Sequence, residues 1–172
     1  INTELKNNSS KTKTVILESS LTDNSGKTVK KLSSKIALQA GESKTINQKT
    51  TVANPQLWSP ETPSLYQVNL LVKEGKNTVD GGMVRIGIRK AEFRGKEGFF
   101  LNDKPYGQLI GGNRHQDFAY VGNAVPNSQQ WRDAKRLRDA GCVIIRTAHY
   151  PQDPSFMDAC DELGMFIIVA TP

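Results

Sequence analysis

Residues 143–169 read VIIRTAHYPQDPSFMDACDELGMFIIV, in which two short apolar runs flank an amphipathic segment. The runs at 143–145 and 166–169 are apolar throughout, as strands buried on both faces usually are. Between them, Asp153-Pro154 is typical of a helix start and Gly164 of a helix end. Strand, helix and strand with short connections predict a parallel βαβ unit. Three apolar residues share one face of the predicted helix: Phe156, Cys160 and Leu163.

The same alternation begins further upstream. Leu109-Ile110 reads as a first short buried strand, and residues 128–140 carry apolar side chains at helical spacing. We expect Asn127 or Ser128 to cap this helix, because both side chains accept hydrogen bonds from free backbone N–H groups. Residues 99–105 predict a short hairpin that precedes the first strand. The apolar positions of the first helix are Trp131, Ala134 and Leu137, and Gly141 lies just past its end.

Residues 1–92 follow a different pattern, in which apolar and polar residues alternate over short segments. Tyr66, Val68, Leu70 and Val72, for example, alternate with polar neighbours. About seven such strands, separated by turn signals, predict an immunoglobulin-like antiparallel β-sandwich. We therefore expect a β-sandwich domain over residues 1–92 and an α/β domain over residues 93–172.

Composition excludes several classes of protein. The net charge of +6 is carried entirely by residues 1–92, mostly as single lysines on alternating segments. This pattern favours a solvated strand face over a nucleic-acid groove, which needs clustered arginine and aromatic residues. The longest apolar run, 165–170, is too short to cross a membrane. The chain starts at Ile1 and shows no targeting signal, so we expect a piece of a longer protein. The start gives no information on location, and for the longer protein we favour a periplasmic or secreted location over a cytoplasmic one.

Cys142 and Cys160 show no zinc-binding spacing. We expect two buried, reduced thiols and no metal site. Trp58 lies in a proline-rich crossing segment, where we expect it to anchor packing; an exposed sugar-stacking platform is the alternative. Gly111-Gly112 lacks the spacing of a phosphate-binding loop, and no helix is predicted to begin there.

Polar residues follow the first two strands of the α/β part. Asn113-Arg114-His115-Gln116-Asp117 follows the first strand, and Arg146-Thr147-Ala148-His149-Tyr150 the second. Ligands of parallel sheets bind at the carboxyl ends of the strands, so both histidines and two arginines should converge there. A structural role for the histidines, and ion pairs of the arginines with Asp117 or Asp153, are the alternatives. The third strand ends in Ala170-Thr171-Pro172, which offers nothing ionisable.

Six segments together resemble glycoside hydrolase family 2, and within it the β-galactosidase subgroup. They include the family's hairpin, its GvNRHxd segment and its iRtsHYP…cDexG segment. They cover residues 57–172 nearly continuously, whereas residues 1–56 fit the same sandwich by pattern only. In chain order they are LWSPE (57–61), GIR (87–89), FLNDKP (100–105), GNRHQD (112–117), IRTAHYP (145–151) and CDELG (160–164).

The resemblance implies an immunoglobulin-like sandwich followed by the first βαβαβ portion of a (β/α)8 TIM barrel. It implies a fragment of a retaining β-glycosidase that hydrolyses O-glycosidic bonds of oligosaccharides. Such enzymes need two carboxylates, and the family's two glutamates lie beyond this chain. No residue here therefore inherits a catalytic role. The substrate-holding positions carry over to His115, Arg146 and His149, and more weakly to Asn113 and Asp117.

The implied partner is a carbohydrate substrate, with no cofactor, metal, nucleic acid or membrane, and a homo-oligomer of the full-length protein is compatible with this interpretation. One departure is Ala170, where many family members have glutamate; we expect a subgroup with its own substrate. The alternative function is a non-catalytic carbohydrate-binding or adhesion module that uses the sandwich.

Overall fold

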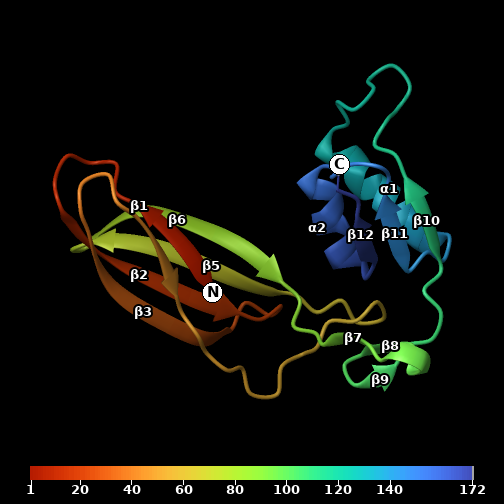
Figure 1. Cartoon of the computed structure of the whole chain (residues 1–172), viewed down its shortest axis with the longest axis horizontal. Helices are drawn as coiled ribbons and strands as arrows, with labels where there is room; N and C mark the ends of the chain where they lie inside the picture. Colours follow the sequence, from red (N-terminus) through yellow and green to blue (C-terminus); the bar gives the residue numbers. More distant parts are fainter. Residues whose placement is uncertain (172) are drawn as a thin grey trace. The chain divides into compact units, whose positions relative to one another are not determined.

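The computed structural model describes residues 1–171. The chain forms two compact units, and Figure 1 labels their helices and most of their strands. The first unit comprises Ile1–Pro55 and Tyr66–Ile86. The second comprises Gln56–Leu65 and the chain from Gly87 onward. The second unit thus includes a segment that interrupts the first unit in the sequence.

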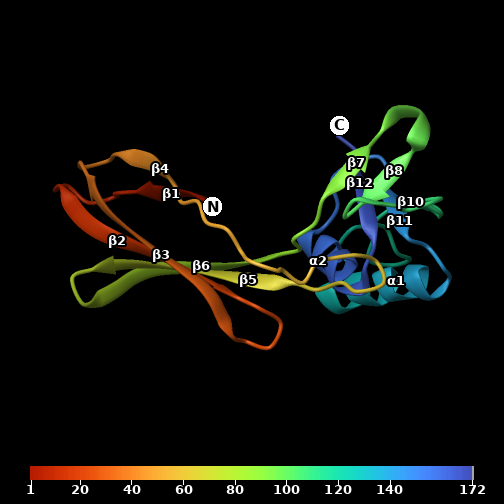
Figure 2. The same ribbon diagram turned by 90° about the horizontal axis from the view of Figure 1, so that it is seen from below.

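The first unit is an antiparallel sandwich of two sheets, as predicted. A four-stranded sheet in the order β3-β2-β5-β6 forms one layer and the β1-β4 pair forms the other (Figure 2). It contains six strands rather than about seven, because the next strand pairs within the second unit. The strands are β1 (Asn2–Lys6), β2 (Lys13–Thr22), β3 (Thr28–Leu38), β4 (Ser43–Asn47), β5 (Tyr66–Glu74) and β6 (Asn77–Ile86).

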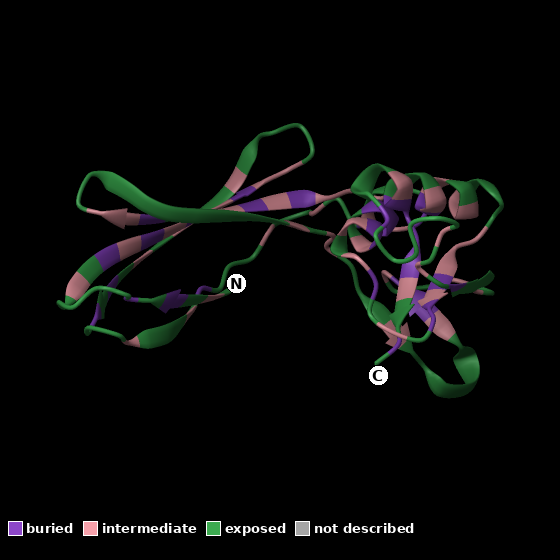
Figure 3. Cartoon of the chain, turned by 90° about the horizontal axis from the view of Figure 1, so that it is seen from above, coloured by how far each residue is buried: buried purple, intermediate pink, exposed green. Residues whose placement is uncertain are grey.

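The sandwich core lies between the β1-β4 pair and the facing part of the larger sheet. Alternation along β2 places Val15 and Leu17 inside, and buried Ser19 donates a hydrogen bond to the Gln48 side chain at 2.5 Å. Almost every residue of β6 is exposed (Figure 3). The apolar cluster consists of Leu5, Val15, Leu17, Ile36, Leu38 and Val72, with Ile46 packed against it.

The second unit contains a parallel sheet in the order β10-β11-β12, with both helices on one face (Figure 2). This is the predicted βαβαβ arrangement. The helices pack on Ile145 through Ala134, Phe156, Ala159 and Cys160, and Met165, which follows α2, belongs to the same cluster. The elements are β7 (Ala91–Phe93), β8 (Phe99–Leu101), β9 (Lys104–Pro105), β10 (Gly111–Arg114), α1 (Asn127–Asp139), β11 (Ile144–Thr147), α2 (Pro154–Leu163) and β12 (Phe166–Val169), with a short 3-10 turn at Gly95–Glu97.

The predicted hairpin is confirmed as β8 and β9, joined by Asn102 and Asp103 with φ of 53° and 64°. Two consecutive residues in the left-handed region are what a tight two-residue hairpin turn requires. The hairpin packs at the amino ends of the parallel strands, where the Phe99 and Phe166 rings meet at 5.4 Å. Leu109 and Ile144 join the same cluster. The opposite, carboxyl edge of the sheet is left for the polar residues.

Trp58 is completely buried in the second unit. Its Nε1–H donates to the carbonyl oxygen of Asp161 at 2.8 Å, and its ring lies edge-on to Phe166 at 5.3 Å. Gly87 lies against it, since a Cβ there would be 2.8 Å from Trp58 Cγ. The packing interpretation is therefore confirmed, and a sugar-stacking role for Trp58 is excluded because no face of the ring is accessible.

The structure corrects the first strand of the α/β part. It runs over Gly111–Arg114, and not over Leu109-Ile110. Gly111 pairs directly with Ile144, and a Cβ at Gly111 would overlap the carbonyl oxygen of Ile144. The strand therefore begins where the absence of a side chain permits close approach, which an apolar pattern cannot indicate.

The first helix also differs from its prediction. It begins at Asn127 with Pro126 as the N-cap, and no side chain caps it, so the predicted caps are wrong. Trp131 is 42% exposed, whereas its neighbour Gln130 is completely buried. The second helix has its predicted bounds, with Asp153 as N-cap and Gly164 in the left-handed conformation at its end.

Both cysteines are free thiols. Cys160 is buried as predicted, and burial raises the pKa of its thiol to about 12. Cys142 is only half-buried, which corrects the expectation of two buried thiols. No helix in the described residues is long and apolar enough to cross a membrane. Of the predicted segment after the third strand, Ala170-Thr171 is described and Pro172 lies outside the described residues.

Candidate functional site

Strand register decides which side chains share a face at the carboxyl edge. Asn113 pairs with Arg146, and Arg114 pairs with Thr147. Side chains of directly paired residues lie on the same face of a sheet, and successive residues alternate between faces. Ile145 packs against the helices. Asn113 and Arg146 therefore lie on the face away from the helices, and Arg114 lies on the helix side.

The two histidines come together at this edge. The ring centroids of His115, just after β10, and His149, just after β11, lie 5.4 Å apart in an edge-on arrangement. The Tyr150 ring lies 6.3 Å from that of His115. The peptide bond between Ala148 and His149 is cis. Two loops that are far apart in the sequence thus form one cluster of rings.

Arg146 orients the second histidine. Its Nη1 lies 3.3 Å from Nδ1 of His149. A guanidinium has only donors, so Nδ1 must accept, and the ring proton of a neutral imidazole is then on Nε2. This arrangement leaves the Nε2–H of His149 able to donate a hydrogen bond to a ligand. The remaining N–H groups of Arg146 make no ion pair with a carboxylate in the described part of the chain.

The other two predicted residues are less constrained. Asn113 is exposed on the same face as Arg146. Asp117 is also exposed, and within residues 1–171 its side chain makes no hydrogen bond or ion pair. The structure therefore brings His115, His149, Arg146 and Asn113 to one face of one edge, whereas no contact links Asp117 to them.

Arg114 does not belong to this cluster, contrary to the expectation that both arginines converge there. It is 6% exposed and pairs with Asp133 on α1 at 2.9 Å, not with Asp117 or Asp153. The physical reason is the alternation of β10, which turns Arg114 toward the helices. The alternative interpretation, an ion pair of Arg114 with Asp117 or Asp153, is therefore wrong as well.

Sequence reasoning missed the side chains that join the two loops. Backbone N–H of Gln116 donates to the Tyr150 hydroxyl at 3.0 Å, and Gln116 Oε1 accepts from the Asp153 backbone N–H at 2.7 Å. Gln152 makes the same kind of link to Arg114. Gln116 and Tyr150 lie in segments that resemble the family but were assigned no role, Gln152 lies outside those segments, and each of the three stands within three positions of a predicted site residue.

The chemistry of the cluster is that of binding and not of bond cleavage. A guanidinium, two imidazoles and an amide supply hydrogen-bond donors to a hydroxyl-rich ligand. Glycoside hydrolysis needs a pair of carboxylates close together. In the described residues, the cluster holds no such pair.

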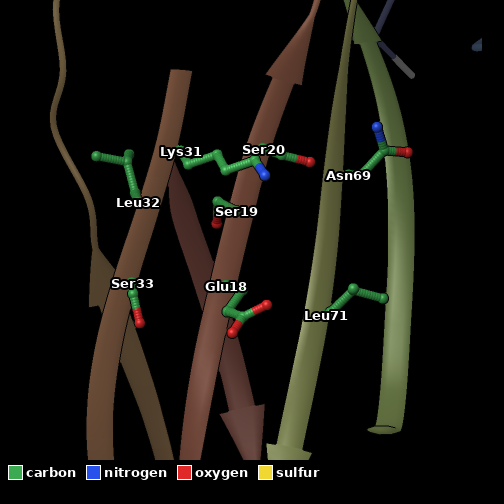
Figure 4. Close-up of a pocket in the computed structure, with 8 residues that line it drawn as sticks. All are labelled: Glu18, Ser19, Ser20, Lys31, Leu32, Ser33, Asn69 and Leu71. Atoms are coloured by element: carbon green, nitrogen blue, oxygen red, sulfur yellow. The ribbon is translucent and has the colours of Figure 1, made fainter. Parts of the chain in front are cut away.

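A separate hollow of about 430 Å³ lies on the larger sheet of the sandwich, lined by residues of β2, β3 and β5 (Figure 4). A sugar-binding face usually offers an aromatic ring for stacking. Within the first unit, the single aromatic residue is Tyr66, which is 4% exposed. The sandwich therefore lacks a stacking platform. The lining residues are Glu18, Ser19, Ser20, Lys31, Leu32, Ser33, Asn69 and Leu71.

Comparison with known proteins agrees with the fold. Residues 1–89 match the family model of glycosyl hydrolases family 2, and residues 92–172 match the TIM barrel domain of that family. A β-galactosidase of Thermoanaerobacter pseudethanolicus is 40% identical over 130 residues, which are 75% of this chain and 17% of that protein. The β-galactosidase BoGH2A of Bacteroides ovatus is 32% identical over 166 residues, which are 96% of this chain and 19% of that protein.

Solved structures give the same result. Bacteroides uniformis β-glucuronidase 2, covalently bound to cyclophellitol-6-carboxylate aziridine, superimposes with a TM-score of 0.93 and 36% identity. The match covers 99% of this chain and 21% of that structure. The chain thus spans about a fifth or less of the length of these relatives.

Proposed function

Because the chain belongs to glycosyl hydrolase family 2, we propose that it is part of a retaining β-glycosidase that hydrolyses O-glycosidic bonds of oligosaccharides. In this proposal residues 1–92 form the sandwich domain, and residues 93–172 form the first part of the catalytic barrel. The acid/base and nucleophile carboxylates are supplied by the rest of the full-length protein. This chain alone is inactive.

The observation that carries the proposal is the hydrogen bond between Arg146 and His149, with His115 beside them at the carboxyl edge of the parallel sheet. Active sites of TIM barrels lie at this edge. Fixed donors aimed at sugar hydroxyls can strengthen as charge develops in the transition state. In the proposal Arg146 and His149 donate hydrogen bonds to the sugar hydroxyls, and His115 and Asn113 line the same pocket. Asp117 lies at its rim.

The substrate class follows from the relatives, which include β-galactosidases and a β-glucuronidase. We propose a β-galactoside as the substrate. The free N–H groups of Arg146 would equally suit the carboxylate of a uronic acid, because guanidinium and carboxylate match in geometry. A β-glucuronide is therefore the substrate to test against it.

The test uses the full-length protein with nitrophenyl β-galactoside, β-glucuronide and, as a control, α-galactoside. We expect hydrolysis of a β-glycoside only, and proton NMR should show that the first sugar released keeps the β configuration. Release of the α anomer would refute the retaining mechanism. Binding of oligosaccharides without any hydrolysis would favour the alternative of a non-catalytic carbohydrate-binding module.

A further inference from the structure

We propose that Arg114 is a positioning residue, which holds the end of β10 and the loop after β11 in the arrangement that the sugar pocket requires. This inference rests on the proposed function for the meaning of the pocket. Its physical basis is a set of contacts on the opposite, helix-facing side of the sheet. Arg114 itself touches no substrate in this proposal.

The side chain of Arg114 is almost fully paired although it is buried. Nε and Nη2 donate to Asp133 Oδ2 at 3.1 and 2.9 Å, and Nη2 also donates to Gln130 Oε1 at 2.8 Å. Nη1 donates to Gln152 Oε1 at 2.6 Å, and the guanidinium carbon lies 4.1 Å from the centre of the Phe156 ring. The guanidinium therefore has one fixed orientation between the two helices and the loop that follows β11.

The backbone of Arg114 binds that same loop. Its carbonyl oxygen accepts from the backbone N–H of Ala148 at 2.9 Å and from Nε2 of Gln152. Gln152 thus contacts Arg114 twice, once at the guanidinium and once at the carbonyl. His149 lies between these two anchor points at residues 148 and 152. A single residue therefore clamps both ends of the loop that carries His149.

The neighbours of Arg114 in the chain are two of the proposed pocket residues. Asn113 precedes it and His115 follows it, and both alternate to the face away from the helices. Fixing the Arg114 side chain on one face therefore fixes the direction of its two neighbours on the other. Through Arg114, the rings of His115 and His149 are held at 5.4 Å by contacts that lie outside the pocket.

Stability alone does not account for this network. The attraction within a buried ion pair offsets little of the free energy needed to desolvate its two charges. A protein that has apolar residues of similar volume in place of the pair is often as stable. What an apolar side chain cannot supply is the hydrogen bond from the guanidinium to Gln152, which is the second of the two contacts that fix the Gln152 side chain. Pocket residues displaced by about 1 Å can cost about a hundredfold in rate. The network therefore provides precise placement of the loop that carries His149.

The test is a double-mutant cycle in the full-length enzyme, read as kcat/KM on the aryl β-glycoside that it hydrolyses. Arg114→Lys keeps the charge beside Asp133 but cannot reproduce the forked contacts, and Gln152→Met removes both links at similar size. We expect each to lower kcat/KM by about 10- to 100-fold. The kcat/KM of the double variant should equal that of the less active single variant, because both substitutions disrupt the same clamp.

The matched control is Arg138→Gln on the same helix, where Arg138 donates to the Pro60 carbonyl oxygen at 2.8 Å. It should lower the Tm and leave kcat/KM within about twofold. A purely structural role for Arg114 would give the control's result, a lower Tm with normal kcat/KM. Multiplicative losses in the double variant would also refute the clamp. Should Arg114→Lys fail to fold, Gln152→Met alone decides between these outcomes.

Amide hydrogen exchange provides a readout independent of activity. In Arg114→Lys and Gln152→Met, exchange should accelerate at residues 113–117 and 146–153, while peptides of β1 to β6 keep their rates. Acceleration spread over the whole protein, or none, would overturn the inference. If the wild-type protein hydrolyses no glycoside, the proposed function fails, and this exchange measurement still decides whether Arg114 positions the two loops.

Discussion

Replacing Gly111 by alanine should damage the parallel sheet, whereas the same replacement at the adjacent Gly112 should not. Gly111 lies opposite Ile144 in the β10-β11 pair, and an added Cβ would overlap the Ile144 carbonyl oxygen. It would also lie 2.6 Å from the carbonyl carbon and 3.0 Å from Cγ2 of Ile144. At Gly112 an added Cβ has no neighbour within 4 Å. The two positions therefore form a matched pair.

The size of the effect follows from what must move. The obstacle at Gly111 is backbone, so β10 has to shift away from β11 and weaken bonds such as that from Val143 N–H to the Ile110 oxygen at 2.8 Å. Overpacking costs about 1–3 kcal/mol and each lost hydrogen bond about 1 kcal/mol. We expect Gly111→Ala to lose about 3 kcal/mol. Gly112→Ala should stay within about 0.5 kcal/mol, or gain slightly because alanine restricts the unfolded chain.

The measurement is the urea concentration at which the full-length enzyme loses half its activity, because activity reports on the barrel and not on the other domains. With a slope of about 1–3 kcal/mol per molar urea, 3 kcal/mol lowers this midpoint by about 1–3 M. Residual kcat/KM in the absence of urea should also fall for Gly111→Ala, since β10 carries Asn113 and precedes His115. Equal midpoints for the two variants would refute the reasoning.

Four further predictions follow from the same structure. Arg146→Lys replaces a fork of donors by a single ammonium, so kcat/KM of the full-length enzyme should fall about 100-fold with little change in Tm; an unchanged value would remove Arg146 from the site. Burial and the hydrogen bond to Glu61 raise the pKa of Tyr106 to about 12. The contribution of the neutral Tyr106 hydroxyl to the free energy of unfolding is therefore complete below pH 10 and is lost between pH 10 and about 12. In unfolding measurements, Tyr106→Phe should abolish that part of the loss of stability at alkaline pH. The raised pKa of Cys160 predicts that iodoacetamide at pH 8 alkylates Cys142 first; equal rates in the folded protein would contradict this. The 172-residue chain alone should self-associate through the unpaired edge of β12, whose last two residues are half exposed, and a monodisperse monomer in light scattering would count against this.

The second helix shows what a sequence predicts well. Asp153 accepts a hydrogen bond from the Ser155 backbone N–H at 2.8 Å, Pro154 occupies the first turn, and Gly164 has a φ of 73°. Each of these properties belongs to one residue and its nearest neighbours. Local chemistry alone therefore places both ends of the helix correctly.

The first parallel strand shows where such reasoning stops. Apolar character indicated Leu109-Ile110, but Leu109 packs with the hairpin and the strand begins at Gly111. Glycine has no side chain whose hydropathy could signal a strand. The reason for its presence is the carbonyl oxygen of Ile144, which lies 33 positions further along the chain and is known only once the strands are paired.

The location of the candidate site could be predicted from the sequence, but the orientation of each side chain in it could not. The rule that ligands bind at the carboxyl edge of a parallel sheet located His115, Arg146 and His149 at one edge. It did not assign Arg114 to the other face, because the predicted strand ended at Ile110 and left Arg114 in a loop, where strand alternation gives no orientation. Gln130 is buried and Trp131 exposed for a related reason: Gln130 accepts a hydrogen bond from Arg114, which a helical pattern of apolar residues does not reveal.

The buried position of Trp58 has a consequence for how such proteins can exchange parts. Residues 56–65 stand within the sandwich portion of the sequence, yet they complete the packing of the second unit. Recombination that joined a foreign sandwich at about residue 90 would replace both Trp58 and Gly87, and the foreign residue at position 58 would face the retained Asp161 carbonyl oxygen. Hybrid genes should therefore remain functional only when the parent that supplies the sandwich carries this tryptophan and this glycine, because both residues are inherited with the sandwich although they pack in the second unit.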